Sequence, residues 1–337
     1  MEVKEMKVLH GLVNYGTQAG MLALGLRNKG VDSISVVTHD TSKRIIDIDI
    51  QDACYHKNAF VRKWRKLKLI FSLFRNNNIF HFYFGKTLLP YNLDIPFYHL
   101  FGKKIIMEYL GTDIDLWLGY NGTDWRNRPI DRVELVKRVI RQAKQFDRQL
   151  VCSPHLYEFV DNSIILPLAL DLSSYAYTPI DFSKKKKLTF MHCPTDRTAK
   201  KSDYIEAALN RLKSKGYDFN YKCVTNVTHS QLKEEYLTSD VVIDQLNFWY
   251  GTVSVEAMAL GRPVVSGYRS HLCHYDKRFE NLPIINADIY NVYNVLKDIL
   301  DGKYDLSEIG MKSREFAMRT HDLSQLTEQL IDIYKNL

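Results

Sequence analysis

Short apolar runs alternate with amphipathic segments along most of the chain. Strands are predicted at 7–12, 33–37, 79–85, 188–192, 219–225, 241–243 and 282–286. Helical periodicity is present at 132–146, 230–238, 289–300 and 323–337. Strands that alternate with helices in this way favour parallel sheets and the α/β class.

The stretch from Asp240 to Gly267 predicts a strand, a loop, a helix and a second strand. Gly251 opens the helical segment, and a glycine and a proline end it ten to twelve residues later. In a parallel sheet, this arrangement places the first amides of the helix at the carboxyl edge, where anions bind. The amides of Thr252 and Val253 are therefore candidates for binding a phosphate.

Glu256 lies about one turn into that helix, on a segment that is otherwise apolar and small. A carboxylate at this place can accept hydrogen bonds from two adjacent hydroxyls of a ribose. It can equally serve as an acidic residue that stabilises the helix dipole near its N-terminus. The spacing alone leaves both interpretations open.

The run from Tyr250 to Val265, YGTVSVEAMALGRPVV, resembles the nucleotide-sugar motif of GT-B glycosyltransferases, particularly glycosyltransferase family 4. The resemblance implies a GT-B fold, with two Rossmann-like domains whose mainly parallel sheets face a cleft. It also implies that Glu256 binds the ribose. Phe248 stands where the family carries a second glutamate, which is a departure from the motif. The candidate contacts to the donor sugar or acceptor in this region are Asp244, Asn247, Trp249 and Tyr250.

Arg197 and Lys200 stand in the loop that precedes the first helix of the second domain. Two cations beside a cleft can neutralise a nucleotide diphosphate and stabilise the charge of the leaving group. The family carries a similar Arg-x-x-Lys pair, so the resemblance implies this catalytic role, although Lys201 replaces the usual glycine. Simple surface charge is the alternative. In relatives the nucleobase lies against the loop that here contains Thr225 and Asn226.

In the first domain, Gly16 and Thr17 follow the first strand and resemble the glycine loop that faces the acceptor in GT-B enzymes. A tight turn selected only for packing is the alternative. Asp113 matches a second cleft loop of the family, so the resemblance implies a catalytic role, although Leu110 replaces the usual histidine. Asp113 and Asp115 also form a D-x-D triplet, which in a GT-A transferase would hold a divalent metal.

A basic amphipathic segment at residues 60–75 carries an aromatic stripe, and no acidic residue occurs between Asp52 and Asp94. These features are typical of a helix that lies on an anionic membrane surface. A surface helix that packs its stripe on its own domain is the alternative. Nucleic acid is not expected, because no recognised nucleic-acid fold accompanies the charge. The candidate membrane residues are Arg62, Lys63, Trp64, Arg65 and Lys66.

The 337 residues suit two domains. We predict an acceptor-side domain at 1–172, a linker at 173–187, a nucleotide-sugar domain at 188–320, and a helix at 321–337 that packs back across the hinge. The five cysteines form no C-x-x-C pair, so neither structural zinc nor a disulfide framework is expected. No apolar run has the length of a membrane span, and the N-terminus does not resemble a signal peptide. We therefore expect a cytoplasmic protein, peripheral to the membrane at most.

Together these features predict a glycosyltransferase that moves a sugar from a nucleotide-diphosphate sugar to a glycan or a lipid-linked acceptor. Surface polysaccharide or glycolipid assembly is the expected setting. Retention of configuration and independence from metals and cofactors follow from the family resemblance. Two alternatives remain open: a non-catalytic sugar-nucleotide binding protein, and a metal-dependent GT-A transferase that uses Asp113 and Asp115.

Overall fold

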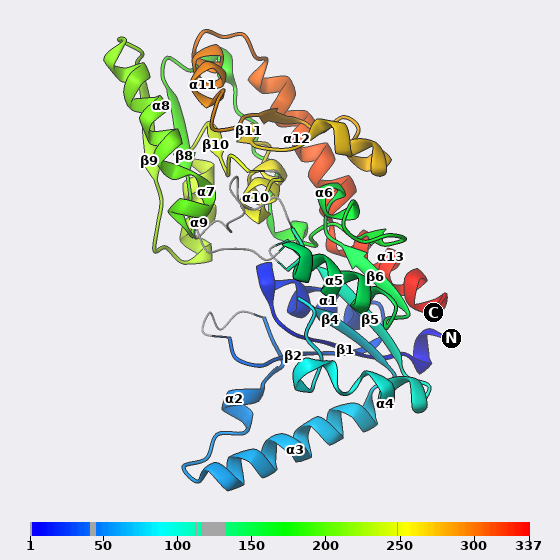
Figure 1. Ribbon diagram of the computed structural model, residues 1–337. Coiled ribbons are helices and arrows are strands. Elements are labelled where there is room, and N and C mark those ends of the chain that lie inside the picture. Colours follow the sequence, from blue (N-terminus) through cyan, green and yellow to red (C-terminus); the bar gives the residue numbers. More distant parts are fainter. Residues whose placement is uncertain (1, 41–44, 112, 116–131, 248) are drawn as a thin grey trace. The chain divides into compact units, whose positions relative to one another are not determined.

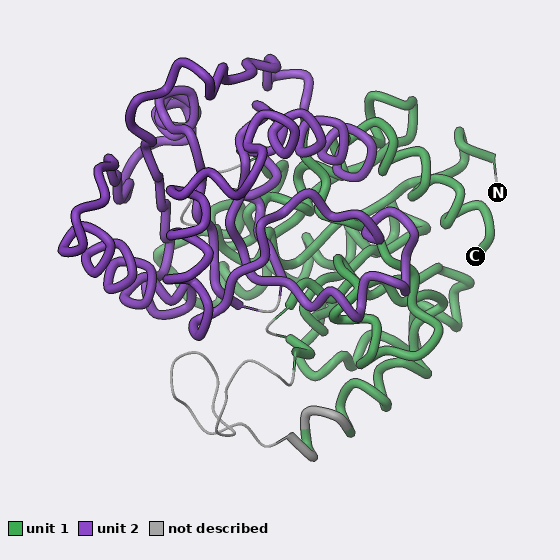
Figure 2. Tube along the Cα trace, turned by 90° about the horizontal axis from the view of Figure 1, so that it is seen from above, with its two compact units in different colours: residues 1–122, 130–171, 323–337 green, residues 123–129, 172–322 purple. Residues whose placement is uncertain are grey.

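The computed structural model describes residues 2–40, 45–111, 113–115, 132–247 and 249–337. The chain forms two compact units, shown in different colours in Figure 2. Among the described residues, unit 1 contains those up to Asp171 together with Leu323–Leu337, and unit 2 contains Leu172–Asp322. Figure 1 labels the helices and strands of each unit.

Unit 1 is built on a seven-stranded sheet in which every strand pair is parallel, in the order β3-β2-β1-β4-β5-β6-β7. All five residues of the central strand β4 are buried, as expected for a strand in a sheet with helices on both faces. The strands are β1 (Lys7–Leu12), β2 (Asp32–Val37), β3 (Ile48–Asp49), β4 (Ile79–Tyr83), β5 (Lys104–Tyr109), β6 (Arg148–Val151) and β7 (Ile164–Ile165).

The helices of unit 1 include the C-terminal helix of the chain. Its buried residues Leu326 and Leu330 share a core with Leu22 and Leu26 of the first helix. The described helices are α1 (Gln18–Asn28), α2 (Ile50–Ala53), α3 (Ala59–Asn76), α4 (Ile95–Leu100), α5 (Arg132–Ala143), α6 (Pro154–Tyr157) and α13 (Leu323–Lys335). None of the helices in the described part of the chain is long and apolar enough to cross a membrane.

Unit 2 is built on a five-stranded parallel sheet in the order β12-β11-β10-β8-β9. The first strand of this unit in chain order is β8. The second, β9, pairs with one edge of β8, and the third, β10, pairs with its other edge. The strand order therefore reverses at β8 and β10, and in open α/β sheets such a switch point is where ligands bind. The strands are β8 (Leu188–His192), β9 (Phe219–Cys223), β10 (Val241–Ile243), β11 (Val264–Ser266) and β12 (Ile284–Asn286).

The helices of unit 2 confirm most of the sequence pattern, but one long helix was not predicted. This is α12, in which Phe316 and Ala317 are buried while polar residues alternate with them. The described helices are α7 (Arg197–Lys200), α8 (Ser202–Ser214), α9 (His229–Leu237), α10 (Thr252–Ala259), α11 (Val292–Leu300) and α12 (Leu306–His321).

The segment at 173–187, expected to be an interdomain linker, packs on unit 2. Tyr175 is buried, and its carbonyl accepts a hydrogen bond of 2.8 Å from Arg314. The amide of Thr178 donates to the carbonyl of Leu260 at 3.3 Å. Lys185 forms an ion pair of 2.7 Å with Asp240. These contacts are long-range, so the lack of periodicity in the segment does not reveal them.

Candidate functional site

The carboxyl edge of the unit 2 sheet brings together Lys200 and Asp244, at the switch point between β8 and β10. The Lys200 ammonium lies 2.5 Å from Oδ1 of Asp244. Oδ2 of the same carboxylate accepts hydrogen bonds from the amide of Gly251 at 2.8 Å and from the hydroxyl of Ser254 at 2.7 Å. Asp244 is therefore fully engaged by protein groups, and it anchors Lys200 beside the N-terminus of α10.

Gly251 is the N-cap residue of α10 and lies against this ion pair. A Cβ atom at this position would lie 3.3 Å from both the Lys200 ammonium and Oδ2 of Asp244. A larger side chain would therefore displace the cation or the carboxylate. The first amides of α10, at Thr252 and Val253, have no carbonyl partner within their own helix, as is general for a helix N-terminus.

Glu256 lies on the next turn of α10 and is mostly buried, with 8% of its surface exposed. Its Oε2 accepts a hydrogen bond of 3.0 Å from the hydroxyl of Tyr236, and its Oε1 lies 2.9 Å from Nε2 of His229. The same nitrogen of His229 lies 3.1 Å from the hydroxyl of Tyr175. The carboxylate is thus held in one orientation while the His229 ring remains largely exposed.

The thiol of Cys193, just after β8, lies within the electrostatic reach of all three charged groups. Burial raises the pKa of Cys193 to about 11, the Lys200 charge opposes this rise, and the charges of Asp244 and Glu256 add to it. Lys200, Asp244, Gly251 and Glu256 therefore form one cluster at the sheet edge. We call these four residues, with the first two amides of α10, the α10 site.

Sequence reasoning did not find His229 and Tyr236. Both lie on α9, seven residues apart, which places them on the same face of that helix. The sequence did contain one indication of them: a histidine and a tyrosine at this spacing occur in the helix that precedes the motif strand. Their partner Glu256 is 20 or more residues away in the sequence, so only the fold joins them.

Arg197, predicted beside Lys200, opens α7 and makes different contacts. Its guanidinium forms ion pairs with Glu206 at 2.6 Å and with Asp203 at 3.3 Å, both on α8. These interactions raise the pKa of Arg197 above its ordinary value, with the hydrogen bond to Glu206 as the main cause. The side chain is nearly half exposed. The two predicted cations therefore lie at opposite ends of the four-residue helix α7, and of the two only Lys200 belongs to the α10 site.

Three other predicted residues lie in loops at the same sheet edge. Thr225 and Asn226 follow β9 and are exposed. The side-chain amide of Asn247 donates to the carbonyl of Ala199. The backbone of Asn247 also packs on Gly267, where a Cβ atom would lie 1.9 Å from the Asn247 carbonyl oxygen. Phe248, the departure from the family motif, lies outside the described residues.

Trp249 and Tyr250, predicted to contact the sugar or acceptor, belong to the aromatic core of unit 2. Trp249 has 7% of its surface exposed and lies 5.5 Å from Phe279, centroid to centroid. The hydroxyl of Tyr250 lies 2.8 Å from Nε2 of His321, at the end of α12. In the sequence these aromatic residues stand at the start of the motif, but Tyr250 packs on Phe316 and His321 of the unpredicted helix α12.

The other predicted site residues belong to unit 1, whereas the α10 site belongs to unit 2. Gly16 and Thr17 both have positive φ angles, 53° and 65°, in the turn that leads from β1 into α1. Asp113 follows β5, and its carboxylate accepts hydrogen bonds from the amides of Gly111 at 2.9 Å and Leu110 at 3.3 Å. Burial raises the pKa of Asp113 to about 7.

The carboxylates of the D-x-D triplet have different partners. Asp113 binds backbone amides, whereas Asp115 lies 3.4 Å from Nε2 of His155. Among the described residues, one group of histidine and aspartate side chains has atoms close enough to share a metal ion: His39, Asp49 and Asp52. Asp49 already caps α2, where it accepts hydrogen bonds from the amides of Gln51 and Asp52.

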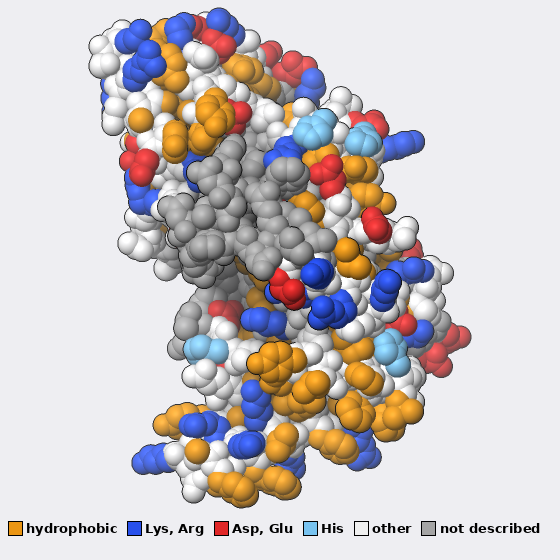
Figure 3. All heavy atoms as spheres, viewed as in Figure 1, with side chains coloured by type: hydrophobic (Ala, Val, Ile, Leu, Met, Phe, Trp, Pro, Cys, Tyr) orange, Lys and Arg blue, Asp and Glu red, His pale blue; other side chains and the backbone are white. Residues whose placement is uncertain are grey.

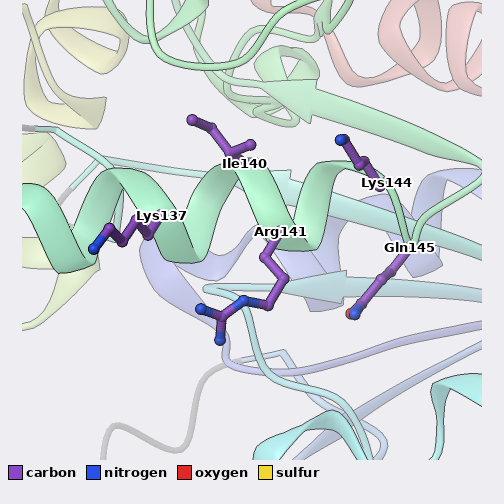
Figure 4. A pocket seen from close by; sticks show the side chains of 5 residues that line it. All are labelled: Lys137, Ile140, Arg141, Lys144 and Gln145. Carbon is purple, nitrogen blue, oxygen red and sulfur yellow. The ribbon is translucent and has the colours of Figure 1, made fainter.

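A separate open groove, with a volume of about 510 Å³, lies along α5 of unit 1. Figure 4 shows its lining side chains, which leave the helix on two sides. No predicted site residue belongs to this groove. Its lining residues are Lys137, Ile140, Arg141, Lys144 and Gln145.

Comparisons with known proteins agree with the two parallel sheets. No protein-family model matches the chain, and no curated protein is significantly similar to it in sequence. Solved structures do match: Anabaena HepE in complex with UDP-glucose has a TM-score of 0.65 at 11% identity, over 99% of this chain and 100% of that one. The chain has the GT-B fold.

Two further GT-B structures indicate how widely this fold is used. An α-glucosyltransferase in complex with UDP-glucose and DNA matches with a TM-score of 0.55 at 14% identity, over 97% of this chain and 98% of that one. A putative UDP-N-acetylglucosamine 2-epimerase from Listeria monocytogenes has the same TM-score at 13% identity, over 99% and 96%. The GT-B fold thus serves both a transferase and a putative epimerase, so the activity has to be argued from the site.

Proposed function

We propose that this GT-B protein is a glycosyltransferase that binds a nucleotide-diphosphate sugar at the α10 site. The observation that carries the proposal is the position of Lys200 and Glu256 on either side of the first turn of α10. A cation, a helix N-terminus and a carboxylate at a sheet switch point match the diphosphate and ribose of one ligand in order.

The diphosphate would bind between Lys200 and the amides of Thr252 and Val253. The cation supplies a full charge, and the helix N-terminus supplies hydrogen-bond donors that are already oriented. Because the leaving group of the reaction is the diphosphate, these groups stabilise the charge that develops in the transition state. Asp244 acts as a positioning residue, since it holds Lys200 in place through Oδ1.

The ribose would bind at Glu256. Tyr236 fixes one carboxylate oxygen from inside the unit, and His229 contacts the other from the exposed side. Two adjacent ribose hydroxyls that donate to this carboxylate would take the place of the His229 contact. His229, which is largely exposed, would then be available to bind the ribose or the diphosphate.

The finer features of the reaction belong to the proposal, and retention of configuration rests on the family resemblance. Lys200 and the helix amides would bind the diphosphate through hydrogen bonds and one positive charge, and we propose that the transferase needs no metal ion in addition. In a retaining front-face route, the leaving phosphate takes the proton of the acceptor, and the protein mainly orients the reactants. Asp113 remains a candidate catalytic residue, because a carboxyl group with a pKa of about 7 exchanges its proton near neutral pH. The expected acceptor is a glycan or a lipid-linked sugar in surface polysaccharide or glycolipid assembly.

The test is thermal stabilisation by UDP, GDP, ADP, CMP and their sugars, with the wild type and Glu256→Gln. Ligands that bind only the native state raise its melting temperature. We expect one diphosphate family to stabilise the wild type and Glu256→Gln to bind it at least tenfold more weakly. Glu234→Gln, an exposed change on α9, is the matched control. If no nucleotide stabilises the wild type, the proposed donor site is wrong.

Product analysis with the nucleotide sugar that binds then separates the activities. Transfer of the sugar to an acceptor, or slow hydrolysis of the donor, supports a transferase. Conversion of the donor sugar to an epimer would instead make the protein an epimerase. Binding without turnover would make it a non-catalytic sugar-nucleotide binding protein.

A further inference from the structure

Helix α3 is almost entirely exposed, although it is eighteen residues long. Leu73 is the one buried residue on it. Its large apolar side chains follow the spacing i, i+4, i+7 and i+11, which places them in one stripe along the helix. They are Phe60, Trp64, Leu67 and Phe71, with exposed fractions of 79%, 64%, 50% and 66%. These four side chains therefore do not pack on unit 1, whereas Phe74, further along the same helix, does contact Phe80 of that unit.

The charge on α3 has a single sign. Six of its eighteen residues are cations, and none is acidic. At the same helical spacing, Lys63, Lys68 and Arg75 fall on the flanks of the apolar stripe, while the other three cations lie further round the helix. The cations are Arg62, Lys63, Arg65, Lys66, Lys68 and Arg75.

A second apolar segment lies against the C-terminal end of α3. Phe74 of α3 is 5.3 Å from Tyr98 and 5.7 Å from Phe101, measured between ring centroids. The segment from Tyr91 to Phe101, which includes α4, exposes five large apolar side chains. These are Tyr91 (94%), Leu93 (64%), Phe97 (51%), Leu100 (75%) and Phe101 (63%). Figure 3 shows apolar and basic side chains gathered over the region of α3 and α4.

The loop before α4 is held in a conformation that presents Tyr91 to solvent. Tyr91 and Asn92 both have positive φ angles, 58° and 59°, which residues with a side chain seldom adopt. The buried carboxylate of Asp94 accepts hydrogen bonds from the hydroxyls of Thr87 and Tyr98. The segment therefore holds Tyr91, which is 94% exposed, at its outer side.

We propose that α3 and the segment from Tyr91 to Phe101 form one docking surface for an anionic lipid bilayer. The helix lies along the headgroup layer, about 27 Å long at 1.5 Å per residue, with its stripe toward the acyl chains. The segment around α4 inserts its side chains beside it. This inference deepens the proposed function, because it would bring a transferase to a lipid-linked acceptor.

Charge and chemistry favour a bilayer over the other occupants. A second copy of the chain would bring two surfaces of the same positive charge together, and like charges repel. Nucleic acid would satisfy the cations and stack on aromatic rings, but it offers nothing to the exposed leucines. An anionic bilayer satisfies both kinds of side chain at the same time. The leucines concerned are Leu67, Leu93 and Leu100.

The two parts of the surface make different contributions to binding. Attraction between the cations of α3 and anionic lipids is screened by salt, whereas burial of the apolar side chains near α4 is not. Binding should therefore have a salt-sensitive part and a salt-resistant part. Each part can be removed separately, because both sets of side chains are exposed.

The experiment is vesicle flotation of the full chain, with phosphatidylglycerol–phosphatidylcholine vesicles and with phosphatidylcholine alone, at low and high salt. The first variant is Lys63→Gln, Lys68→Gln, Arg75→Gln, which removes the cations that flank the apolar stripe. It should bind anionic vesicles on the order of a hundredfold more weakly at low salt, from about fivefold per cation. The second, Leu93→Ser, Phe97→Ser, Leu100→Ser, should weaken the binding that remains at high salt, because the stripe on α3 supplies only part of it. Tyr290→Ser with Met311→Ser, at exposed positions in unit 2, is the control.

Several results would overturn the docking surface. The proposal is wrong if the wild-type protein does not bind anionic vesicles, or if each variant binds them as tightly as the wild type. It is also wrong if the wild type is a dimer that the second variant dissociates. Single-stranded nucleic acid that binds as tightly as the vesicles and competes with them would also overturn it. Nucleotide stabilisation of the same variants is measured in parallel. If a protein that does not bind vesicles is still stabilised by nucleotide, the docking surface has failed while the donor site is intact.

Discussion

At the residue scale, the ion pair between Lys200 and Asp244 is central to the α10 site. Burial alone would raise the pKa of Asp244, but the charge of Lys200 and its hydrogen bond, with help from Ser254 and Gly251, hold that pKa below its ordinary value. The carboxylate is therefore ionised at neutral pH and depends on the ammonium. Because Lys200 is 12% exposed, it alone of the two can also reach a ligand.

This dependence gives a prediction for Lys200→Met. The change leaves a buried carboxylate without its cation, so the free energy of unfolding should fall by about 3 kcal/mol at pH 7. Nucleotide binding should be lost as well. In Lys200→Met with Asp244→Asn, stability should largely return while nucleotide binding does not. Urea unfolding and thermal shift with UDP measure the two effects.

The neighbouring Lys201→Met is the matched control, and it should leave both quantities nearly unchanged. Recovery of nucleotide binding in the double variant would show that Lys200 has only a structural role.

A second residue-scale prediction concerns Glu108, which lies in the core of unit 1 with Oε2 2.9 Å from Nε2 of His81. Burial raises the pKa of Glu108 to about 8 and lowers that of His81 to about 3, so both groups are neutral at pH 7. From about pH 4.5 to 8 the folded state keeps a proton on Glu108 that the unfolded state has lost. The free energy of unfolding therefore falls as pH rises through this window.

Glu108→Gln removes this pH dependence, because the amide resembles the protonated carboxyl group and does not ionise. We expect the variant to gain stability relative to wild type by about 1.4 kcal/mol per pH unit within the window. The opposite slope that His81 contributes below pH 6.5 is present in both proteins and cancels. Urea unfolding at pH 5, 7 and 9 measures the difference. A difference that does not change with pH would place the pKa of Glu108 near its ordinary value.

At the element scale, α13 completes the core of unit 1, and its contact with α1 depends on a glycine. A Cβ atom at Gly25 would lie 2.2 Å from Oγ1 of Thr327 and 2.9 Å from Cδ1 of Leu323. Gly25→Ala should therefore overpack the contact between the helices and lower the free energy of unfolding by about 1–3 kcal/mol. Thr327→Ala in the same chain should recover part of the loss, because it removes the nearest atom. Thermal and urea unfolding of both single variants and the double variant test this coupling.

The elements show which information the sequence contained. The strands at 7–12, 188–192 and 241–243 were predicted correctly, because short apolar runs between turns have few other interpretations. Helix α12 was not predicted, since small and polar residues weaken its apolar period. Helix α3 was predicted, but its pattern fits a stripe that packs or a stripe that is exposed. Only the neighbours supplied by the fold decide between the two.

At the scale of the whole molecule, the sequence indicated the GT-B fold but did not show to which unit every segment belongs. The segment at 173–187 joins unit 2 through long-range contacts that no local pattern encodes, whereas the family resemblance did indicate that the last helix leaves the second domain. The site was partly predictable for the same reason. The motif contained Glu256 and Gly251, whereas the partners of Glu256 on α9 and the burial of Trp249 depend on packing.

The two proposals give separate footprints along the chain, which hydrogen exchange can measure on the intact protein. A bound nucleotide should protect amides in unit 2, near Lys200, after β9 and at the start of α10, because these loops meet at one sheet edge. Anionic vesicles should protect α3 and the segment from Tyr91 to Phe101 in unit 1. Lys200→Met should remove the first footprint and leave the second. Nucleotide protection limited to the loops after β1 and β5 would instead place the donor site in unit 1, and the role assigned to α10 would then be wrong.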